Sequence, residues 1–240
     1  LDLKVSLKGI RLSDPNAEIK TIVCQNNLFS SCKRSIKPTH ISNNEIDFAH
    51  PDALIFKGGN EFRIFDLKNL RYNSKGIRSI DFHGGMFHAQ LIKDQSRRNN
   101  RYSYYADFNG KFTVKLEGSE RSNIEADYIW TYFSLEAPME LDQGKSVYIY
   151  GELTGWLISP EFRLSYSYER KAYENRILTK QGIYSYRYLV IDDATEEIDI
   201  THFEGSYFET ENSYSIQIYY KPFGSRYDRI IGYQSFSNFK

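Results

Sequence analysis

The segment around Ser206 is the first place where this sequence could support nucleophilic catalysis. Such catalysis needs a serine or cysteine within hydrogen-bond reach of a base. Ser206 follows Glu204 and Gly205, and His202 lies four residues before it. A nucleophile elbow has a glycine on both sides of the serine, and here the second glycine is missing. We therefore expect a turn with a hydrogen-bonded histidine, and we predict no catalytic residue and no enzymatic activity.

Two other groups of residues could bind a metal ion. His83 and His88 flank the glycine pair at 84–85 and could face one another, but two ligands are too few for zinc. Residues 192–199 contain five acidic side chains, yet they lack the spaced glycine and the final bidentate glutamate of a helical calcium loop. We expect a solvated acidic turn there, and we predict neither a metal site nor a cofactor.

Composition excludes several classes of partner. The 31 basic and 31 acidic residues balance, so no net field draws the protein onto nucleic acid or anionic lipid. The apolar runs are far shorter than the roughly 20 residues that a membrane-spanning helix needs. We expect no signal peptide ahead of Leu1. We expect a soluble chain that does not span the membrane and is either cytoplasmic or already processed.

The pattern of the chain is that of strands. Twenty tyrosines and 16 phenylalanines suit half-buried β surfaces better than helices. Residues 147–191 are the most regular stretch, and they predict two antiparallel strands around a shaped corner. Residues 128–135 are apolar on both faces, which predicts a central strand. A glycine pair at 84–85 predicts a hairpin over residues 77–92. Asn-Gly at 109–110 predicts a second hairpin over residues 102–116.

The predicted fold class is all-β, with two tandem immunoglobulin-like or early-set β-sandwich domains. At 240 residues the chain can form two units of roughly 100 residues each. Residues 117–126 have no apolar period, so we place the boundary there, between an N-terminal domain (1–122) and a C-terminal domain (123–240). Residues 93–101 are charged and predict a solvated loop, or else a cationic face for a partner. Residues 203–208 resume the strand pattern.

Cys24 and Cys32 are the only cysteines in the chain, with seven residues between them. In an oxidising compartment they could link a strand to the following loop. In a reducing compartment they would be free thiols. The sequence slightly favours free thiols, because a single pair is not a disulfide framework.

The stretch from Val147 through Gly151 and Trp156 to the strand at 182–188 resembles the glycogen-binding type of β-sandwich module. In that family tryptophans stack on sugar rings, and Trp156 matches the first of them. The later tryptophan has no counterpart near residues 192–195. The resemblance implies an alternative function, in which the protein binds an α-glucan-like carbohydrate. The residues for this alternative are Trp156, Tyr166 and Tyr168.

A wider resemblance covers most of the chain. The matching strings are KGGNEFRIFDLKNLRY (57–72), EADYIWTYFSL (125–135), VYIYGELTGW (147–156) and EGSYFETENSYSIQIYYKPFGSRYDRIIGYQ (204–234). Together they resemble the plug protein family of the type IX secretion system in Bacteroidetes. Members of that family are periplasmic β-sandwich proteins beneath the outer-membrane translocon, and they close its periplasmic opening. They also tend to have another β domain ahead of the point where this chain starts.

This resemblance implies a non-enzymatic protein of the periplasm, associated with the outer membrane, whose partner is the translocon protein. Arginine and tyrosine are typical of interface hot spots. The candidate partner-binding residues are Arg63, Asp66, Arg71 and Tyr72 in the first domain, and Arg226, Tyr227, Asp228 and Arg229 in the second. The alternative is that both groups are intramolecular and clamp loops or the domain junction.

Overall fold

A computed structural model describes residues 3–7, 9, 12–26, 31–42, 44–49 and 54–238 of the chain. Strands dominate these residues, and the two α-helices have one turn each, which confirms the predicted β class. None of the described helices is both long and apolar enough to cross a membrane.

The chain forms two compact units, and their boundaries differ from the predicted ones. Unit 1 combines Leu1–Lys57 with Glu211–Lys240, and unit 2 is Gly58–Thr210. Unit 2 is therefore inserted into unit 1, and the two are not in tandem. The boundary predicted after residue 122 lies inside unit 2, where strands from both sides of it pair with each other. The absence of an apolar period over residues 117–126 therefore indicates a connection within unit 2 and not a boundary between units.

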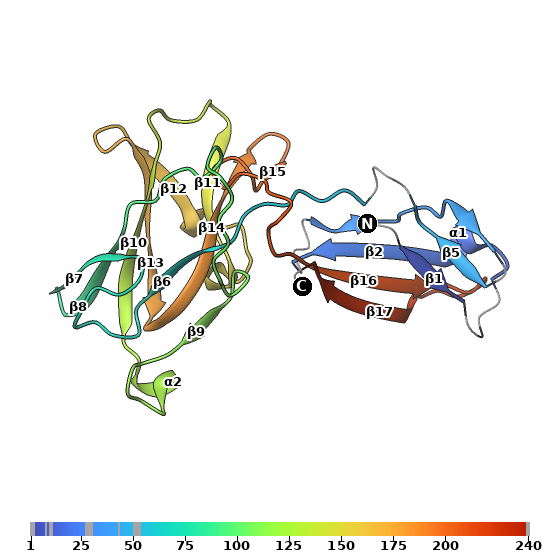
Figure 1. Ribbon diagram of the computed structural model, residues 1–240, viewed down its shortest axis with the longest axis horizontal. Helices are drawn as coiled ribbons and strands as arrows, with labels where there is room; N and C mark the ends of the chain where they lie inside the picture. The colour runs from blue at the N-terminus through green and yellow to red at the C-terminus, as the bar shows by residue number, and fades with distance from the viewer. Residues whose placement is uncertain are drawn as a thin grey trace. The chain divides into compact units, whose positions relative to one another are not determined.

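Unit 1 contains two antiparallel sheets with a common core (Figure 1). One sheet has the order β1-β5-β4 and the other β17-β16-β2-β3. Ile46 of β5 and Phe48, which follows that strand, pack with Val23, Ile216 and Ile218 from the second sheet. The elements are β1 (Lys4–Ser6), α1 (Pro15–Glu18), β2 (Ile19–Gln25), β3 (Lys33–Arg34), β4 (His40–Ile41), β5 (Glu45–Asp47), β16 (Ser213–Tyr220) and β17 (Arg229–Ser237).

Cys24 and Cys32 form a disulfide, so the slight preference for free thiols is wrong. The register of the sheet explains the bond. Val23 in β2 pairs with Lys33 in β3, and the two strands are antiparallel. Cys24 follows Val23 and Cys32 precedes Lys33, so the two cysteines lie opposite each other. Their Cα atoms are 4.1 Å apart. Sequence spacing alone does not reveal this cross-strand pairing.

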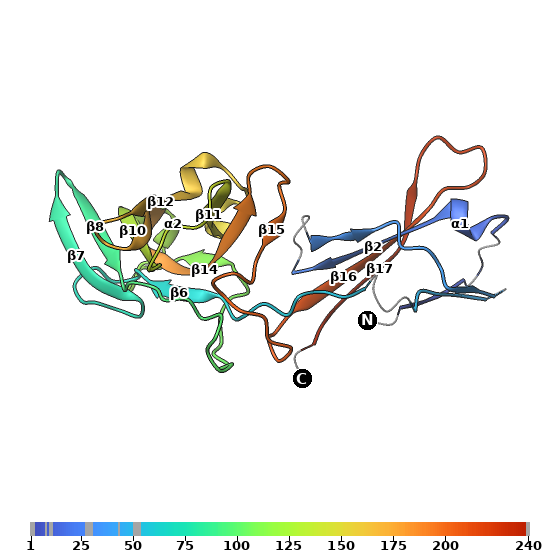
Figure 2. The same cartoon turned by 90° about the horizontal axis from the view of Figure 1, so that it is seen from above.

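Unit 2 is organised around β14, the longest strand. The second half of β14 pairs with β11, and its first half pairs with β6 and β9. Figure 2 shows β6 beside β14. The strands are β6 (Arg63–Asp66), β7 (Ile77–His83), β8 (Met86–Leu91), β9 (Phe112–Val114), β10 (Tyr128–Glu136), β11 (Lys145–Tyr150), β12 (Arg163–Ser167), β13 (Ala172–Lys180), β14 (Gly182–Asp192) and β15 (Ile198–Asp199). The helical turns are α2 (Ser122–Glu125), η2 (Glu152–Thr154) and η3 (Pro160–Phe162).

The remaining strand order in unit 2 is β15-β14-β11-β12-β13-β10-β8-β7. Strand β10 lies between β13 and β8, so the prediction of a central strand is confirmed. The hairpin around the glycine pair is also confirmed, with β7 joined to β8. The interior is rich in aromatic rings, and Phe65 stacks on Tyr184 and meets the edges of Phe133 and Tyr186.

Two strand predictions in unit 2 are wrong. Residues 101–108 form no strand, and β9 pairs with β14 instead of with them. The carboxylate of Asp107 explains this, because it accepts hydrogen bonds from the backbone N–H groups of Phe62 and Asn109. Residues 203–208 also form turns and not a strand.

Candidate functional site

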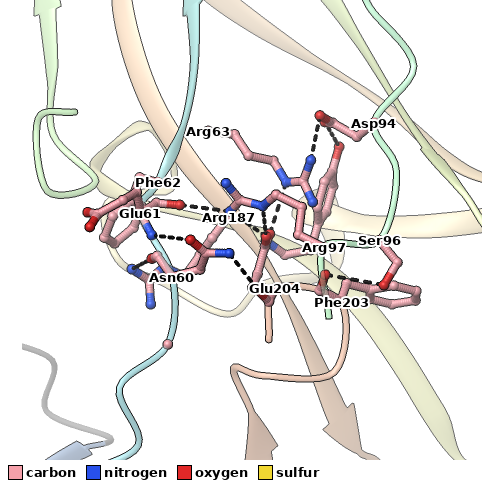
Figure 3. Close-up of polar contacts among 12 residues, drawn as sticks. Asn60, Glu61, Phe62, Arg63, Asp94, Ser96, Arg97, Arg187, Phe203 and Glu204 are labelled. Atoms are coloured by element: carbon pink, nitrogen blue, oxygen red, sulfur yellow. Dashed lines mark hydrogen bonds and ion pairs between the residues drawn. The ribbon is translucent and has the colours of Figure 1, made fainter. Parts of the chain in front are cut away.

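Unit 2 contains a buried charge network, defined here as Arg63, Asp94, Arg97 and Glu204 (Figure 3). Glu204 is 1% exposed and lies between the two guanidinium groups. Its Oε1 accepts from Arg63 Nε at 3.0 Å, and its Oε2 accepts from Arg97 Nε at 2.9 Å. Arg63 Nη1 donates to Asp94 Oδ1 at 2.8 Å. The four charges therefore form one continuous chain.

The backbone places each member of the network. Arg63 begins β6 and pairs with Tyr186 of β14, which brings it beside the tyrosines of that strand. Asp94 follows β8 and accepts from the hydroxyls of Tyr186 and Tyr188, at 2.6 and 2.8 Å. Glu204 also accepts from the N–H of Tyr188, at 3.0 Å. The solvated loop predicted over residues 93–101 is therefore wrong for the residues that reach this network.

Charge pairing controls the protonation of Glu204. Burial by itself would raise its pKa, but Arg63 and Arg97 outweigh burial and lower the pKa to about 2. A carboxylate with this pKa, whose oxygens already accept several hydrogen bonds, is a poor general base or acid near neutral pH. Glu204 is therefore ionised at neutral pH, and its ion pairs link β6 to the segment after β8 and to the turn at residue 204.

A third arginine, Arg187, lies near this network, and Glu204 and Asp107 act on its charge. It forms no ion pair with a carboxylate among the described residues. Its guanidinium lies 3.5 Å from the ring centroid of Phe62, and one Nη donates to the carbonyl of Asn60 at 3.3 Å. Its Nε has no hydrogen-bond partner among the described residues. Burial lowers the pKa of Arg187 to about 10, so it remains charged at neutral pH.

Trp156 packs against Phe62, the ring that Arg187 faces. It meets Phe62 edge-on at 6.4 Å and Tyr150 at 5.5 Å between ring centroids. Tyr166 and Tyr168 contact each other, and Tyr168 is 75% exposed and bonds to Glu140. Among the described residues, no ring contact joins either tyrosine to Trp156. The structure therefore does not bring the three glycan-binding candidates into one aromatic platform.

The first group of partner-binding candidates is divided by burial. Arg63 is buried in the charge network, and Asp66 forms an ion pair with Lys68 at 3.3 Å. Arg71 lines a pocket of about 360 Å³ with a mixed polar and apolar wall. Tyr72 is 53% exposed and donates to Glu117 at 2.8 Å. Arg63 is thus intramolecular, and Arg71 and Tyr72 lie where a partner could reach them.

The second group lies in and beside the last strand of unit 1. Arg226 and Tyr227 are exposed in the loop before β17, and Arg229 begins the strand. Asp228 Oδ2 accepts from Lys20 Nζ at 2.8 Å, so its charge is balanced locally. No ion pair with a described residue is found for Arg226 or Arg229. The structure brings these four residues together on one surface.

This surface continues along β17, and we define the β17 surface as residues 226–237. Tyr227, Ile230 and Tyr233 are 65%, 54% and 63% exposed. Strand β17 is nine residues long and is at one end of its sheet. Exposed apolar side chains that are contiguous and rimmed by polar residues mark interaction sites. We therefore select the β17 surface as the candidate functional site.

Comparison with known proteins gives a match to a solved structure. No family model and no curated protein matches this chain. A crystal structure of a hypothetical protein from Parabacteroides merdae matches with a TM-score of 0.93 and 31% identity. The match covers 98% of this chain and 59% of the Parabacteroides chain. Parabacteroides is a genus of the Bacteroidetes.

The histidines first considered for chemistry make ring-packing contacts. The ring of His202 packs on Phe203, and its Nδ1 lies 4.0 Å from Asp199 Oδ2. The rings of His83 and His88 stack at 3.6 Å between centroids, as their positions across the hairpin allow. A search of the described residues finds no group of three possible metal ligands.

Acid should weaken unit 2 through Glu204. Its pKa is lowered from 4.5 to about 2, so its stabilisation is fully present above pH 4.5 and is lost as pH falls toward 2. The shift corresponds to about 3 kcal/mol. Both tryptophans, Trp130 and Trp156, lie in unit 2. Urea unfolding followed by tryptophan fluorescence should show this loss between pH 4.5 and 2, and a curve that stays flat there would contradict the network.

Proposed function

We propose that this chain is a non-enzymatic periplasmic plug that binds the outer-membrane translocon of the type IX secretion system and closes its periplasmic opening. The observation that carries the proposal is the β17 surface. It presents two arginines without ion pairs to described residues, Arg226 and Arg229, next to the exposed ring of Tyr227. Arginine and tyrosine dominate the binding energy of many protein interfaces.

A plug must bind tightly enough to seal and weakly enough to leave. Interfaces of this kind are moderate in size and keep a polar rim around an apolar centre. On the β17 surface Ile230 and Tyr233 supply apolar area, and the arginines and Ser235 supply the polar part. This composition supports reversible docking onto a protein.

Three further features support the proposal. Disulfides persist in oxidising compartments such as the periplasm, and Cys24 and Cys32 form one in unit 1. The matching Parabacteroides structure comes from the phylum to which the resembling plug family belongs. The buried charge network adds rigidity to unit 2, which suits a protein that blocks an opening by its shape.

Charge reversal on the β17 surface tests the function. The change Arg226→Glu with Arg229→Glu replaces two cations by two anions and leaves the cores of both units untouched. If the translocon presents an anionic rim, we expect co-purification of translocon with the chain to fall by roughly tenfold or more. The measurement is the amount of translocon recovered with tagged chain from detergent-solubilised outer membranes.

The matched control reverses two exposed arginines of unit 2, Arg78 and Arg121, and should leave recovery unchanged. If wild-type chain recovers no translocon, the proposed function is wrong. If the chain recovers translocon and the reversal at 226 and 229 has no more effect than the control, the function stands and the β17 surface is the wrong site.

A further inference from the structure

Strand β17 has the features of an edge that accepts another strand. Among the described residues it pairs with β16 on one side, and the sheet ends on its other side. Natural proteins usually protect an edge with short strands, lysine, proline or a covering loop. Strand β17 is nine residues long, RIIGYQSFS, and its one charged residue is Arg229 at the start. A β-bulge, which is another protective device, lies at Ile231 between Ile230 and Gly232. Residues 233–237 contain no charged residue and no proline, so this part of the edge lacks protection in its sequence.

The hydrogen-bond pattern shows which backbone groups lie on the open side. Asn238 N donates to Asn212 O at 3.0 Å, on the β16 side of the pair. Backbone groups alternate between the two sides of a strand, so the N–H and C=O of Ser235 and Tyr233 point away from β16. The bond from Asn26 N to Ser213 O supports this assignment. It shows that the backbone groups of the odd-numbered residues of β16 point toward β2, so those of the even-numbered residues point toward β17.

The side chains around this edge define what would fit it. Ile230, Ile231 and Tyr233 expose apolar surface along the strand. Arg226 and Arg229 form a cationic group at its N-terminal end, where Asp228 is already paired with Lys20. An occupant that complements these charges has carboxylates at that end and apolar residues along its length.

We propose that β17 accepts an extended segment of the partner protein as an added antiparallel strand, with acidic residues at the C-terminal end of that segment. Every strand pair in this sheet is antiparallel, and this direction places the acidic end beside Arg226 and Arg229. Strand addition provides main-chain hydrogen bonds for affinity and side-chain contacts for specificity. The inference rests on the proposed plug function only for the identity of the partner.

A second copy of the chain fits this edge less well. Strand β17 of a copy contains no acidic residue, so pairing two copies would leave the arginines of both without a carboxylate from the added strand. Charge complementarity therefore favours an acidic segment of a different protein. Dimerisation of the chain at micromolar concentration, without binding of an acidic strand, would overturn this choice of occupant.

The change Ser235→Pro tests strand addition without disturbing the existing ladder. Proline lacks an N–H, and the N–H of residue 235 points away from β16, so no bond to β16 is lost. The residue before a proline favours extended backbone, which suits Gln234. The matched control Ser235→Ala keeps the N–H. Both variants should keep the circular dichroism spectrum and the melting temperature of the wild type.

The probe is a labelled synthetic peptide, Thr-Val-Thr-Val-Thr-Val-Asp-Asp, titrated with the full chain by fluorescence anisotropy at low salt. We expect Ser235→Pro to weaken binding roughly tenfold and Ser235→Ala to leave it unchanged. A second peptide has the same sequence but ends in Lys-Lys. The wild-type chain should bind the Asp-Asp peptide more tightly, and the double variant Arg226→Glu with Arg229→Glu should bind the Lys-Lys peptide more tightly. The switch would support the charge assignment even if the proline variant failed to fold.

Failure of this inference can be distinguished from failure of the plug function. Absence of peptide binding to wild-type chain, or equal binding by a folded Ser235→Pro variant, would overturn strand addition, whereas translocon recovery tests the function separately. If wild-type chain and Ser235→Pro recover equal amounts of translocon, docking does not use the edge. If Ser235→Pro loses the translocon and Ser235→Ala keeps it, strand addition is the docking mode.

Discussion

Replacing Glu204 by glutamine is expected to destabilise unit 2 by about 3–5 kcal/mol, the usual cost of removing one partner from a buried ion pair. Glu204 neutralises Arg63 and Arg97 together, and it is almost fully buried. Without its charge, three arginines remain close together, because Arg187 lies in the same region. The measurement is urea unfolding at pH 7 followed by tryptophan fluorescence, which reports unit 2.

The matched control is Glu169→Gln, in an exposed turn of the same unit, which should leave the midpoint unchanged. A double-mutant cycle adds Arg97→Gln. The double variant should lose clearly less free energy of unfolding than the sum of the two single variants, because the two side chains act on each other. Additive losses would show that Glu204 and Arg97 are not coupled, and the network as described would then be wrong.

Replacing both cysteines by serine is expected to lower the free energy of unfolding of unit 1 by about 2–4 kcal/mol, since the crosslink restricts the unfolded chain. The disulfide joins Cys24 in β2 to Cys32 just before β3. Hydrogen exchange resolved by segment gives the measurement, because unit 1 contains no tryptophan. Exchange should accelerate in β2 and β16.

A reductant provides the control for the disulfide. Reduction of the wild-type chain should accelerate exchange in β2 to the same degree as the double serine variant, and the variant should not respond to reductant. If oxidised wild type and variant exchange at the same rate, the disulfide does not stabilise unit 1. Equal exchange would also remove one support for a periplasmic location.

The sequence predicts the elements of this fold better than their connections. Alternation and turn residues correctly predict β10 and the hairpin of β7 and β8, because these signals are local. The insertion of unit 2 depends on β16 pairing with β2 across almost the whole chain, and no local pattern encodes that pairing. A tandem arrangement was therefore the expected but incorrect interpretation.

The buried charge network was the main feature missed in the sequence. Arg97 and Asp94 occur in a charged segment that is typical of a solvated loop, and Glu204 occurs near a glycine that indicates a turn. One signal was present: Arg187 lies within the strand 182–192, between Tyr186 and Tyr188, in an otherwise apolar run. Burying a charge costs free energy unless it has a partner, so a charge in such a run indicates buried partners nearby. This signal could have directed attention to the region.

The candidate surface was predictable in part. Resemblance to the plug family drew attention to Arg226, Tyr227, Asp228 and Arg229, and the structure places these residues together at the start of β17. The sequence could not indicate that β17 ends its sheet, because this depends on which strands pair. The open side of Tyr233 and Ser235 is therefore a result of the structure alone.

The measurement that tests the central claim most directly is hydrogen exchange of the full chain with and without purified translocon. The account predicts slower exchange over residues 226–237, strongest at the N–H groups of Tyr233 and Ser235, with little change in the interior of unit 2. Protection confined to other segments, with exchange in β17 unchanged when the translocon is bound, would contradict it.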